Sequence, residues 1–326
     1  MAARVIDIAK DEGLAVRTAC ELLSEGLPVA IPTETVYGLA ADATNPAAVA
    51  RIYETKGRPR FNPLICHVAD LEMAERYGVF DPLTRKLAEA FWPGPLTLVV
   101  PLKAGCGIHP LATAGLDTVG LRVPRGFAAA VIRAFDRPLA APSANTSGRI
   151  SPTSAKHVAQ DLGDKLSLIL DGGASLVGVE STILRVEGDR LRLLRPGGVA
   201  AEDIEHLTGL RLERQDGPAP AIEAPGMLAS HYAPSAAVRL DATDAQPGEA
   251  LIRFGGRPTA GTETAAAVFD LSPGGDLAEA AMNLFDTLKR ADAVGATRIA
   301  VAPVPDHGLG EAINDRLARA AAPRDN

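Results

Sequence analysis

The feature that most constrains this chain is the repeated alternation of short apolar runs of strand length with helix-like segments, separated by polar turns. Five polar turns follow such runs or helices: "PTETVYG", "KGRPRFNPLICH", "DTVGLRVP", "APSANTSGRISPT" and "VESTILR". Strand–helix alternation combined with hairpins predicts an α/β fold with a twisted mixed sheet and flanking helices. Because such sheets bind ligands at the carboxyl ends of their strands, we expect the five turns to converge on one crevice. Taken singly, each turn is also consistent with side chains that merely satisfy their own backbone.

Local signals define several elements. In "NPAAVARIYETKG" Asn45 can cap a helix, Pro46 occupies its first turn and Gly57 follows its end. "STILRVEGDRLRLLRP" reads as a hairpin that turns at Gly188 and Asp189. Other helices are expected over 9–25, 70–77 and 82–91, with strands at "PLICHVA", "LTLVVPL", "TVGLRVP" and "SLILDGG".

The pattern divides the chain into three parts. Residues 1–210 carry the mixed pattern and form the expected first domain. Residues 211–235 are rich in Pro, Ala and Gly without a clear period, so we expect a linker. Residues 236–326 alternate strands and helices and predict a smaller, Rossmann-like α/β domain.

Composition excludes several classes of protein. The 326 residues are 47% hydrophobic and 22% charged, which is typical of a globular chain with a substantial core. No run approaches the ~20 apolar residues of a membrane span, and the charged start lacks the apolar core of a signal peptide. We therefore expect a cytoplasmic protein with no membrane contact. The net charge of −7 argues against stable binding of nucleic acid.

One basic cluster stands out against this acidic background. Arg51, Lys56, Arg58 and Arg60 fall within ten residues. Lys56 ends a predicted helix, where it also offsets the helix dipole. An Arg beside a Lys, stiffened by the following proline, is suited to bind phosphate oxygens. The cluster thus indicates a small anionic ligand.

Common catalytic and nucleotide-binding motifs are missing from the sequence. It contains no GxxxxGK[ST] loop, no GxGxxG after a strand and no HExxH, and Ser181 in "GVES" lacks the glycines of a nucleophile elbow. His67 interrupts an apolar run and is either a core histidine or a ligand-binding group. The three cysteines form no metal or disulfide pattern and are expected to be core residues. No dedicated metal site is predicted.

Taken in order, the motifs resemble a known family. "PTETVYGL", "KGRP…NPL" followed by "H", "LRVP", "APSAN.SG…SPT", "ESTI" and "LRPG" are similar to the YrdC-like domain. The later "APGM…SHYAP" and the final α/β segment resemble the long form of threonylcarbamoyl-AMP synthases. The resemblance covers nearly the whole chain, and the ordered set is far more specific than any single motif.

The resemblance implies an activity. Proteins of this family make threonylcarbamoyl-AMP and pyrophosphate from L-threonine, bicarbonate and ATP. A downstream tRNA threonylcarbamoyl transferase then uses the product to modify N6 of adenosine 37. Mg²⁺ is expected to arrive with the ATP phosphates, because the sequence offers no acidic cage for it.

The resemblance also implies that residues 1–210 are the catalytic domain, that the linker 211–235 is a lid over the active site, and which residues form that site. The expected threonine-binding residues are Thr35, His67, Arg122, Ala141 and Ser181. The expected ATP-binding residues are Lys56, Arg58, Asn62, Thr118, Ser143, Asn145, Ser151, Arg195 and Tyr232. Lys56 and Arg58 are the expected catalytic residues, acting on the phosphates. Arg122 would bind the threonine carboxylate by two parallel hydrogen bonds, and Ala141 would act only through its backbone. Thr33 and Glu34 are assigned to turn structure.

Two other functions compete with this one. A YrdC-like domain could serve as an RNA-binding module, although the acidic charge and the lack of aromatic-rich RNA motifs argue against it. A carbamoyl-transfer domain like that of hydrogenase maturation proteins is the other alternative. Such proteins carry zinc-finger and acylphosphatase-like segments before this domain, and the present sequence has no CxxC pair.

Overall fold

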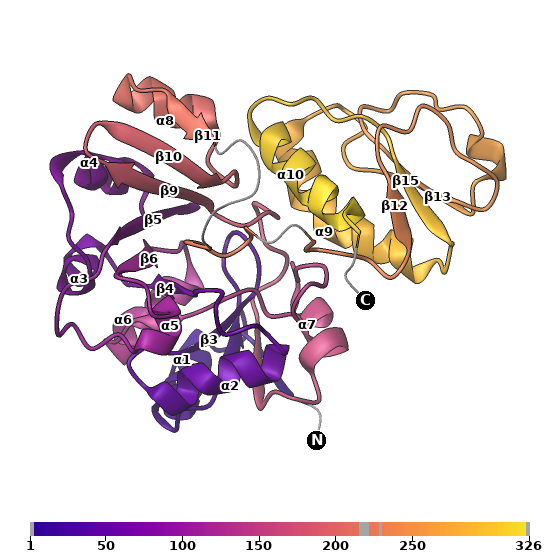
Figure 1. Ribbon diagram of the computed structural model, residues 1–326. Coiled ribbons are helices and arrows are strands. Elements are labelled where there is room, and N and C mark those ends of the chain that lie inside the picture. The colour runs from indigo at the N-terminus through magenta and orange to yellow at the C-terminus, as the bar shows by residue number, and fades with distance from the viewer. Residues whose placement is uncertain (1–2, 215–221, 228–229, 324–326) are drawn as a thin grey trace.

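Two sheets organise the molecule (Figure 1). The computed structural model describes residues 3–214, 222–227 and 230–323. The larger, eleven-stranded sheet is mixed, in the order β1-β8-β2-β3-β7-β4-β6-β5-β9-β10-β11. The smaller sheet has the order β12-β15-β13-β14, and all of its pairings are parallel. The predicted α/β fold, with a twisted mixed sheet and a second Rossmann-like unit, is confirmed.

The strands of the large sheet are β1 (Arg4–Asp7), β2 (Val29–Ile31), β3 (Gly38–Asp42), β4 (Ile65–His67), β5 (Leu96–Pro101), β6 (Thr118–Arg122), β7 (Leu139–Ala140), β8 (Leu168–Asp171), β9 (Thr182–Glu187), β10 (Arg190–Arg195) and β11 (Leu212–Arg214). The helices that accompany it are α1 (Glu12–Ser24), α2 (Pro46–Lys56), α3 (Leu71–Tyr77), α4 (Pro82–Phe91), α5 (Pro110–Thr113), α6 (Phe127–Phe135), α7 (Ala155–Leu162) and α8 (Ala201–Thr208).

The smaller unit contains β12 (Ala237–Arg239), β13 (Ala250–Arg253), the 3₁₀ turn η1 (Thr262–Thr264), β14 (Ala267–Asp270), α9 (Leu277–Ala293), β15 (Arg298–Val301) and α10 (Leu309–Ala321). Helix α10 lies on the side of this unit that faces the first domain (Figure 1). An exposed ion pair joins the two units there, because Arg214 Nε of β11 donates to Glu311 Oε1 of α10 at 2.7 Å.

Helix α2 shows how the sequence sets a boundary. The Asn45 side chain accepts hydrogen bonds from the backbone N–H groups of Ala47 and Ala48. At the other end Gly57 adopts φ +60°, a left-handed conformation that glycine tolerates without a steric penalty. The two caps fix the bounds of α2, and the C-terminal cap at Gly57 places Arg58 directly after the helix.

The expected linker is partly described. Its segments 215–221 and 228–229 lie outside the described residues. Strand β11, which falls within the range that the sequence assigned to the linker, pairs in parallel with β10. Glu223 forms ion pairs with Arg185 and Arg192, which tie the described segment 222–227 to the β9–β10 hairpin.

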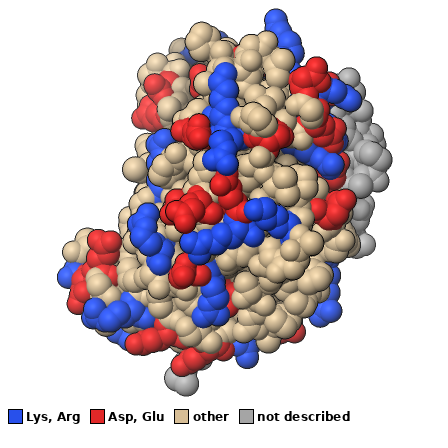
Figure 2. All heavy atoms as spheres, turned by 90° about the vertical axis from the view of Figure 1, so that its left-hand side faces the viewer, with Lys and Arg blue, Asp and Glu red and all other residues tan. Residues whose placement is uncertain are grey.

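Charge is interspersed on the surface. On the face shown in Figure 2, basic and acidic side chains alternate without a continuous field of one sign. Within the described residues, no helix is both long and apolar enough to cross a membrane.

Candidate active site

The five polar turns meet at one cavity, as expected from their places in the chain. It contains about 580 Å³ of space not filled by protein atoms, part of it open to solvent. Each turn contributes, with Thr35 after β2, Arg58 after α2, Arg122 at the end of β6, Ser143 after β7 and Ser181 before β9. The chain beyond the first domain closes one side with Pro225, Gly226, His231 and Tyr232.

Nine of the predicted site residues line this cavity: Thr35, Arg58, His67, Arg122, Ala141, Ser143, Ser181, Arg195 and Tyr232. Four others lie behind its wall: Lys56, Asn62, Asn145 and Ser151. Thr118 instead lines a second, smaller cavity of about 270 Å³, beside Glu223 and Pro225 of the linker.

The Lys56 ammonium is held inside the protein. Its side chain is 1% exposed, and Nζ donates to the carbonyl oxygens of Ser143, at 2.5 Å, and of Asn145. Burial, followed by the positive charge of Arg58, lowers the pKa of Lys56 well below its ordinary value. Lys56 lies at the end of α2, as predicted, and its ammonium group holds the turn that carries Ser143.

Arg58 presents its charge at the cavity while its remaining donors are satisfied. Its Nε and Nη2 atoms donate to the carbonyl oxygens of Asn62, at 3.2 Å, and Pro63, at 2.8 Å. Burial lowers the pKa of Arg58 to about 10, so the guanidinium remains charged at neutral pH. The loop that follows α2 thus holds a fixed cation against the cavity.

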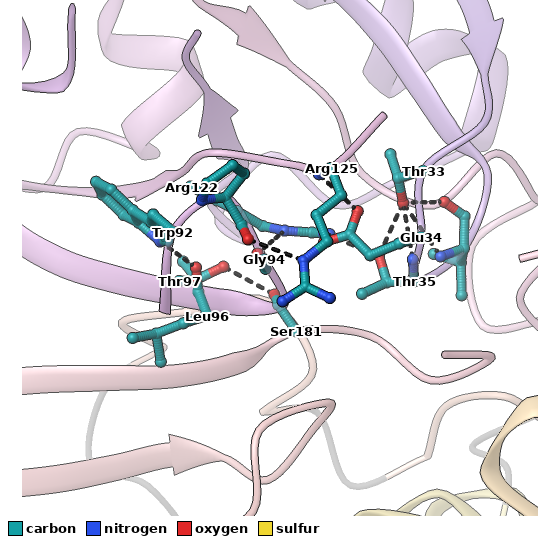
Figure 3. A network of polar contacts seen from close by, with 12 residues as sticks. Thr33, Glu34, Thr35, Trp92, Gly94, Leu96, Thr97, Arg122, Arg125 and Ser181 are labelled. Carbon is teal, nitrogen blue, oxygen red and sulfur yellow. Dashed lines mark hydrogen bonds and ion pairs between the residues drawn. The ribbon is translucent and has the colours of Figure 1, made fainter. Parts of the chain in front are cut away.

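Arg122 and Thr35 lie side by side (Figure 3), and both line the cavity. Arg122 Nη1 donates to Thr35 Oγ1 at 2.9 Å, and Arg122 Nε donates to the Gly94 carbonyl at 3.1 Å. Thr33 Oγ1 donates to the Val36 carbonyl at 2.6 Å and lies 2.8 Å from Thr35 Oγ1, which confirms its assignment to the turn. The hydroxyl of Thr35 is therefore oriented from two sides.

Glu34 does more than form a turn. Its Oε1 lies 2.7 Å from Arg122 Nη2 in a buried ion pair, and its Oε2 accepts from the backbone N–H of Arg125 at 3.1 Å. The assignment of Glu34 to turn structure alone is corrected, because this carboxylate balances the arginine expected to bind substrate. A lone Glu between two threonines gives no local signal of a partner 88 residues away in sequence.

Ser181 is positioned by two neighbours, of which Figure 3 shows Thr97. Its hydroxyl lies 2.8 Å from Thr97 Oγ1 and accepts from Arg195 Nη2 at 3.2 Å. Arg195 also donates to the Ser181 carbonyl, at 2.9 Å from Nη2, and to the Pro225 carbonyl of the linker, at 3.3 Å from Nη1. Arg195 consequently connects the "EST" turn to the linker at Pro225.

Two histidines on the wall are neutral. Burial lowers the pKa of His67 and of His231 to about 3 in each case. The Nδ1 atom of each ring is buried and has no hydrogen-bond partner among the described residues. Both residues line the cavity.

The cavity is equipped for an anion that carries additional polar groups. Arg58, Arg122 and Arg195 supply three cations, while neutral imidazoles and hydroxyls supply donors and acceptors. Among the described residues, no three His, Cys, Asp or Glu side chains lie together as metal ligands. Fold and site together define an α/β protein whose large domain has a cavity suited to a small anionic ligand, with linker residues on one side of it.

Comparison with known proteins gives the family. The family described as "Telomere recombination" (Sua5, YciO, YrdC) matches residues 21–197, and "Threonylcarbamoyl-AMP synthase, C-terminal domain" matches residues 199–322. A threonylcarbamoyl-AMP synthase of Pyrococcus abyssi is 42% identical over 95% of this chain and 94% of its own length. One from Bacillus subtilis is 42% identical over 94% of this chain and 92% of its own.

A solved structure agrees with these relatives. The crystal structure of P. abyssi Sua5 complexed with L-threonine superposes with a TM-score of 0.88 at 38% identity, covering 98% of each chain. The chain belongs to the threonylcarbamoyl-AMP synthase family. The resemblance found in the motifs is confirmed over the full length.

Proposed function

We propose that this protein is a threonylcarbamoyl-AMP synthase that joins L-threonine, bicarbonate and ATP, and releases pyrophosphate. Identity of 42% to two synthases over nearly the whole chain carries the proposal. The cavity supports it, since three arginines beside hydroxyls and neutral imidazoles suit substrates that bear phosphates, a carboxylate and a hydroxyl.

The threonine side of the cavity is proposed at Thr35, His67, Arg122, Ala141 and Ser181. Arg122 would take the threonine carboxylate through its guanidinium. The Thr35 and Ser181 hydroxyls are already oriented by Arg122 and by Thr97, so little side-chain freedom is lost on binding.

The ATP side is proposed around Arg58, Ser143, Arg195 and Tyr232, which line the same cavity. Lys56, Asn62, Asn145 and Ser151 would act from behind the wall: Lys56 holds the carbonyls of residues 143 and 145, and the Ser151 hydroxyl donates to Glu180 at 2.6 Å. Thr118 would join them only if the nucleotide extends into the second cavity.

The reaction needs positioning and charge more than a nucleophile from the protein. The threonine amine and bicarbonate give a carbamate and water. A carbamate oxygen then forms a bond to the α-phosphorus of ATP, the bond from that phosphorus to the β-bridging oxygen breaks, and pyrophosphate leaves. Arg58 would stabilise the charge that develops on the phosphates. Lys56 would support this from behind the wall, by holding the carbonyls of Ser143 and Asn145. Because the carbamate is labile in water, exclusion of solvent by the covering segment protects it.

Mg²⁺ is proposed to accompany ATP and to neutralise charge on its phosphates. The two carboxylates at the site support this, since Glu34 is already paired with Arg122 and Glu180 with Arg316.

We also propose that residues 1–210 are the catalytic unit, 211–235 the linker that acts as a lid, and 236–326 the second unit. We propose that the product passes to a tRNA threonylcarbamoyl transferase that modifies adenosine 37, and that the protein is cytoplasmic.

One assay tests the activity. Purified protein is incubated with ATP, bicarbonate and Mg²⁺, with and without L-threonine, and pyrophosphate is measured. Release that depends on threonine is expected, with L-serine as the comparison substrate. Release that is equal without threonine would reject the proposal.

A further inference from the structure

The turn that carries Glu180 is docked tightly on the second domain. Val179 is fully buried and belongs to the hydrophobic cluster formed by the second domain, together with Phe285 of α9 and Ile313 of α10. A Cβ added to Gly178 would lie 2.3 Å from the Cα of Met282 in α9, a distance that forces the backbones apart. The "GVES" turn therefore takes its position from the second domain as well as from its own sheet.

Arg316 of α10 extends this contact to the cavity wall. Its side chain is fully buried, Nε donates to Glu180 Oε2 at 2.8 Å, and Nη2 donates to the Pro196 carbonyl at 3.0 Å. Its guanidinium carbon lies 5.2 Å from the centre of the Tyr232 ring. One side chain thus holds two residues, Glu180 and Tyr232, that line the cavity.

Glu180 connects Arg316 to Ser151. Its other oxygen, Oε1, accepts from the Ser151 hydroxyl at 2.6 Å, so its two oxygens are fixed by different domains. Burial by itself would raise the pKa of Glu180, but the positive charges of Arg316 and Arg195 and the bond from Ser151 hold it below the ordinary value. The ionisable groups that face Glu180 are Lys56, Arg195, His231, Tyr232 and Arg316.

We infer that Arg316 is a positioning residue of the active site: from the second domain it fixes Glu180 and Tyr232, and through Glu180 it fixes Ser151. The inference rests on the proposed function, because Tyr232 is a proposed ATP contact and Ser151 is proposed to support the ATP side from behind the wall. It gives residues 236–326 a specific task, which is to complete the nucleotide side of the cavity. The second domain is then part of the active site without contacting the substrate.

Two substitutions of Arg316 test this role against a matched control. Arg316→Gln removes the charge, and Arg316→Lys keeps it with fewer donors. Arg214→Gln breaks the other ion pair between the domains on the same helix, at Glu311, away from the cavity. For each variant we would measure the melting temperature, the ATP dissociation constant by calorimetry, kcat and KM for ATP, and the pH profile of kcat/KM.

We expect Arg316→Gln to weaken ATP binding at least about fivefold and to move the acid limb of the pH profile upward, because Glu180 loses a cation. Arg316→Lys should recover part of both effects, and Arg214→Gln should bind ATP like the wild type. A folded Arg316→Gln with wild-type ATP affinity and pH profile would overturn the inference, as would an equal loss in Arg214→Gln.

If Arg316→Gln does not fold, the variant that combines it with Glu180→Gln removes the uncompensated buried charge. We expect this double variant to fold, to bind ATP weakly and to lack the shifted acid limb; wild-type ATP affinity in it would overturn the inference. The calorimetric comparison of ATP affinities tests the role of Arg316 even if the wild type releases no pyrophosphate. Absence of pyrophosphate release would reject the proposed function, which is a separate result.

Discussion

Replacing Arg122 by lysine tests the proposed carboxylate site. The arginine contacts the Gly94 carbonyl, the Thr35 hydroxyl and the Glu34 carboxylate with three different nitrogens. Lysine retains a charge for Glu34, so it avoids leaving a buried carboxylate unpaired, which costs about 3–5 kcal/mol. It cannot offer two parallel donors to a substrate carboxylate.

The expected loss is one charge-assisted hydrogen bond, worth about 1.5–3 kcal/mol. This corresponds to a fall in kcat/KM for threonine of about 10- to 150-fold, since each 1.36 kcal/mol is tenfold. Initial rates of pyrophosphate release at varied threonine and saturating ATP measure it, while KM for ATP should change by less than about twofold.

Arg125→Lys is the matched control for this substitution. Arg125 is three residues away, and its guanidinium contacts the Pro93 carbonyl instead of the cavity. Its kinetics should match those of the wild type. The reasoning is refuted if folded Arg122→Lys retains wild-type kcat/KM for threonine, or if Arg125→Lys loses as much.

Three further predictions follow from the same geometry. Arg58→Ala removes a fixed cation from the cavity and should lower activity about tenfold or more; near-native turnover would remove Arg58 from the site. His67 is neutral when folded, with its pKa lowered to about 3, so its unfolded form binds more protons below pH 6.5, and this residue alone should lower stability by about 2 kcal/mol between pH 7.5 and 5, in addition to a similar contribution from His231. Thermal melts should show a smaller fall for His67→Gln, and an unchanged pH dependence would contradict the assignment. Asn45→Ala removes the cap of α2 and should cost about 1 kcal/mol of stability with kcat/KM unchanged, as melting and rate measurements would show; unaltered stability would contradict the capping role.

Much of the fold was predictable because its signals are local. The caps of α2 and the turn of the β9–β10 hairpin depend on residues adjacent in sequence, and the structure places both as expected. Strand β3, "GLAAD", was not predicted, since small residues have little strand preference of their own. It forms because β2 and β7 pair with its two edges.

The site was predictable to the extent that polar turns at strand ends converge. Charge pairing across the fold was not predictable, because Glu180 and Arg316 lie 136 residues apart in sequence and belong to different domains. The sequence also could not show that the Lys56 ammonium turns inward to two carbonyls, because that depends on where the turn at residues 143–145 comes to lie.

The most direct test of the account is the identity of the product. The protein is incubated with ATP, ¹³C-bicarbonate and ¹⁵N-threonine. The nucleotides are then separated, and their masses are measured by mass spectrometry. We predict an adenylate that carries both labels, formed with one equivalent of pyrophosphate. An adenylate without the ¹³C label, or AMP and ADP alone, would contradict the account.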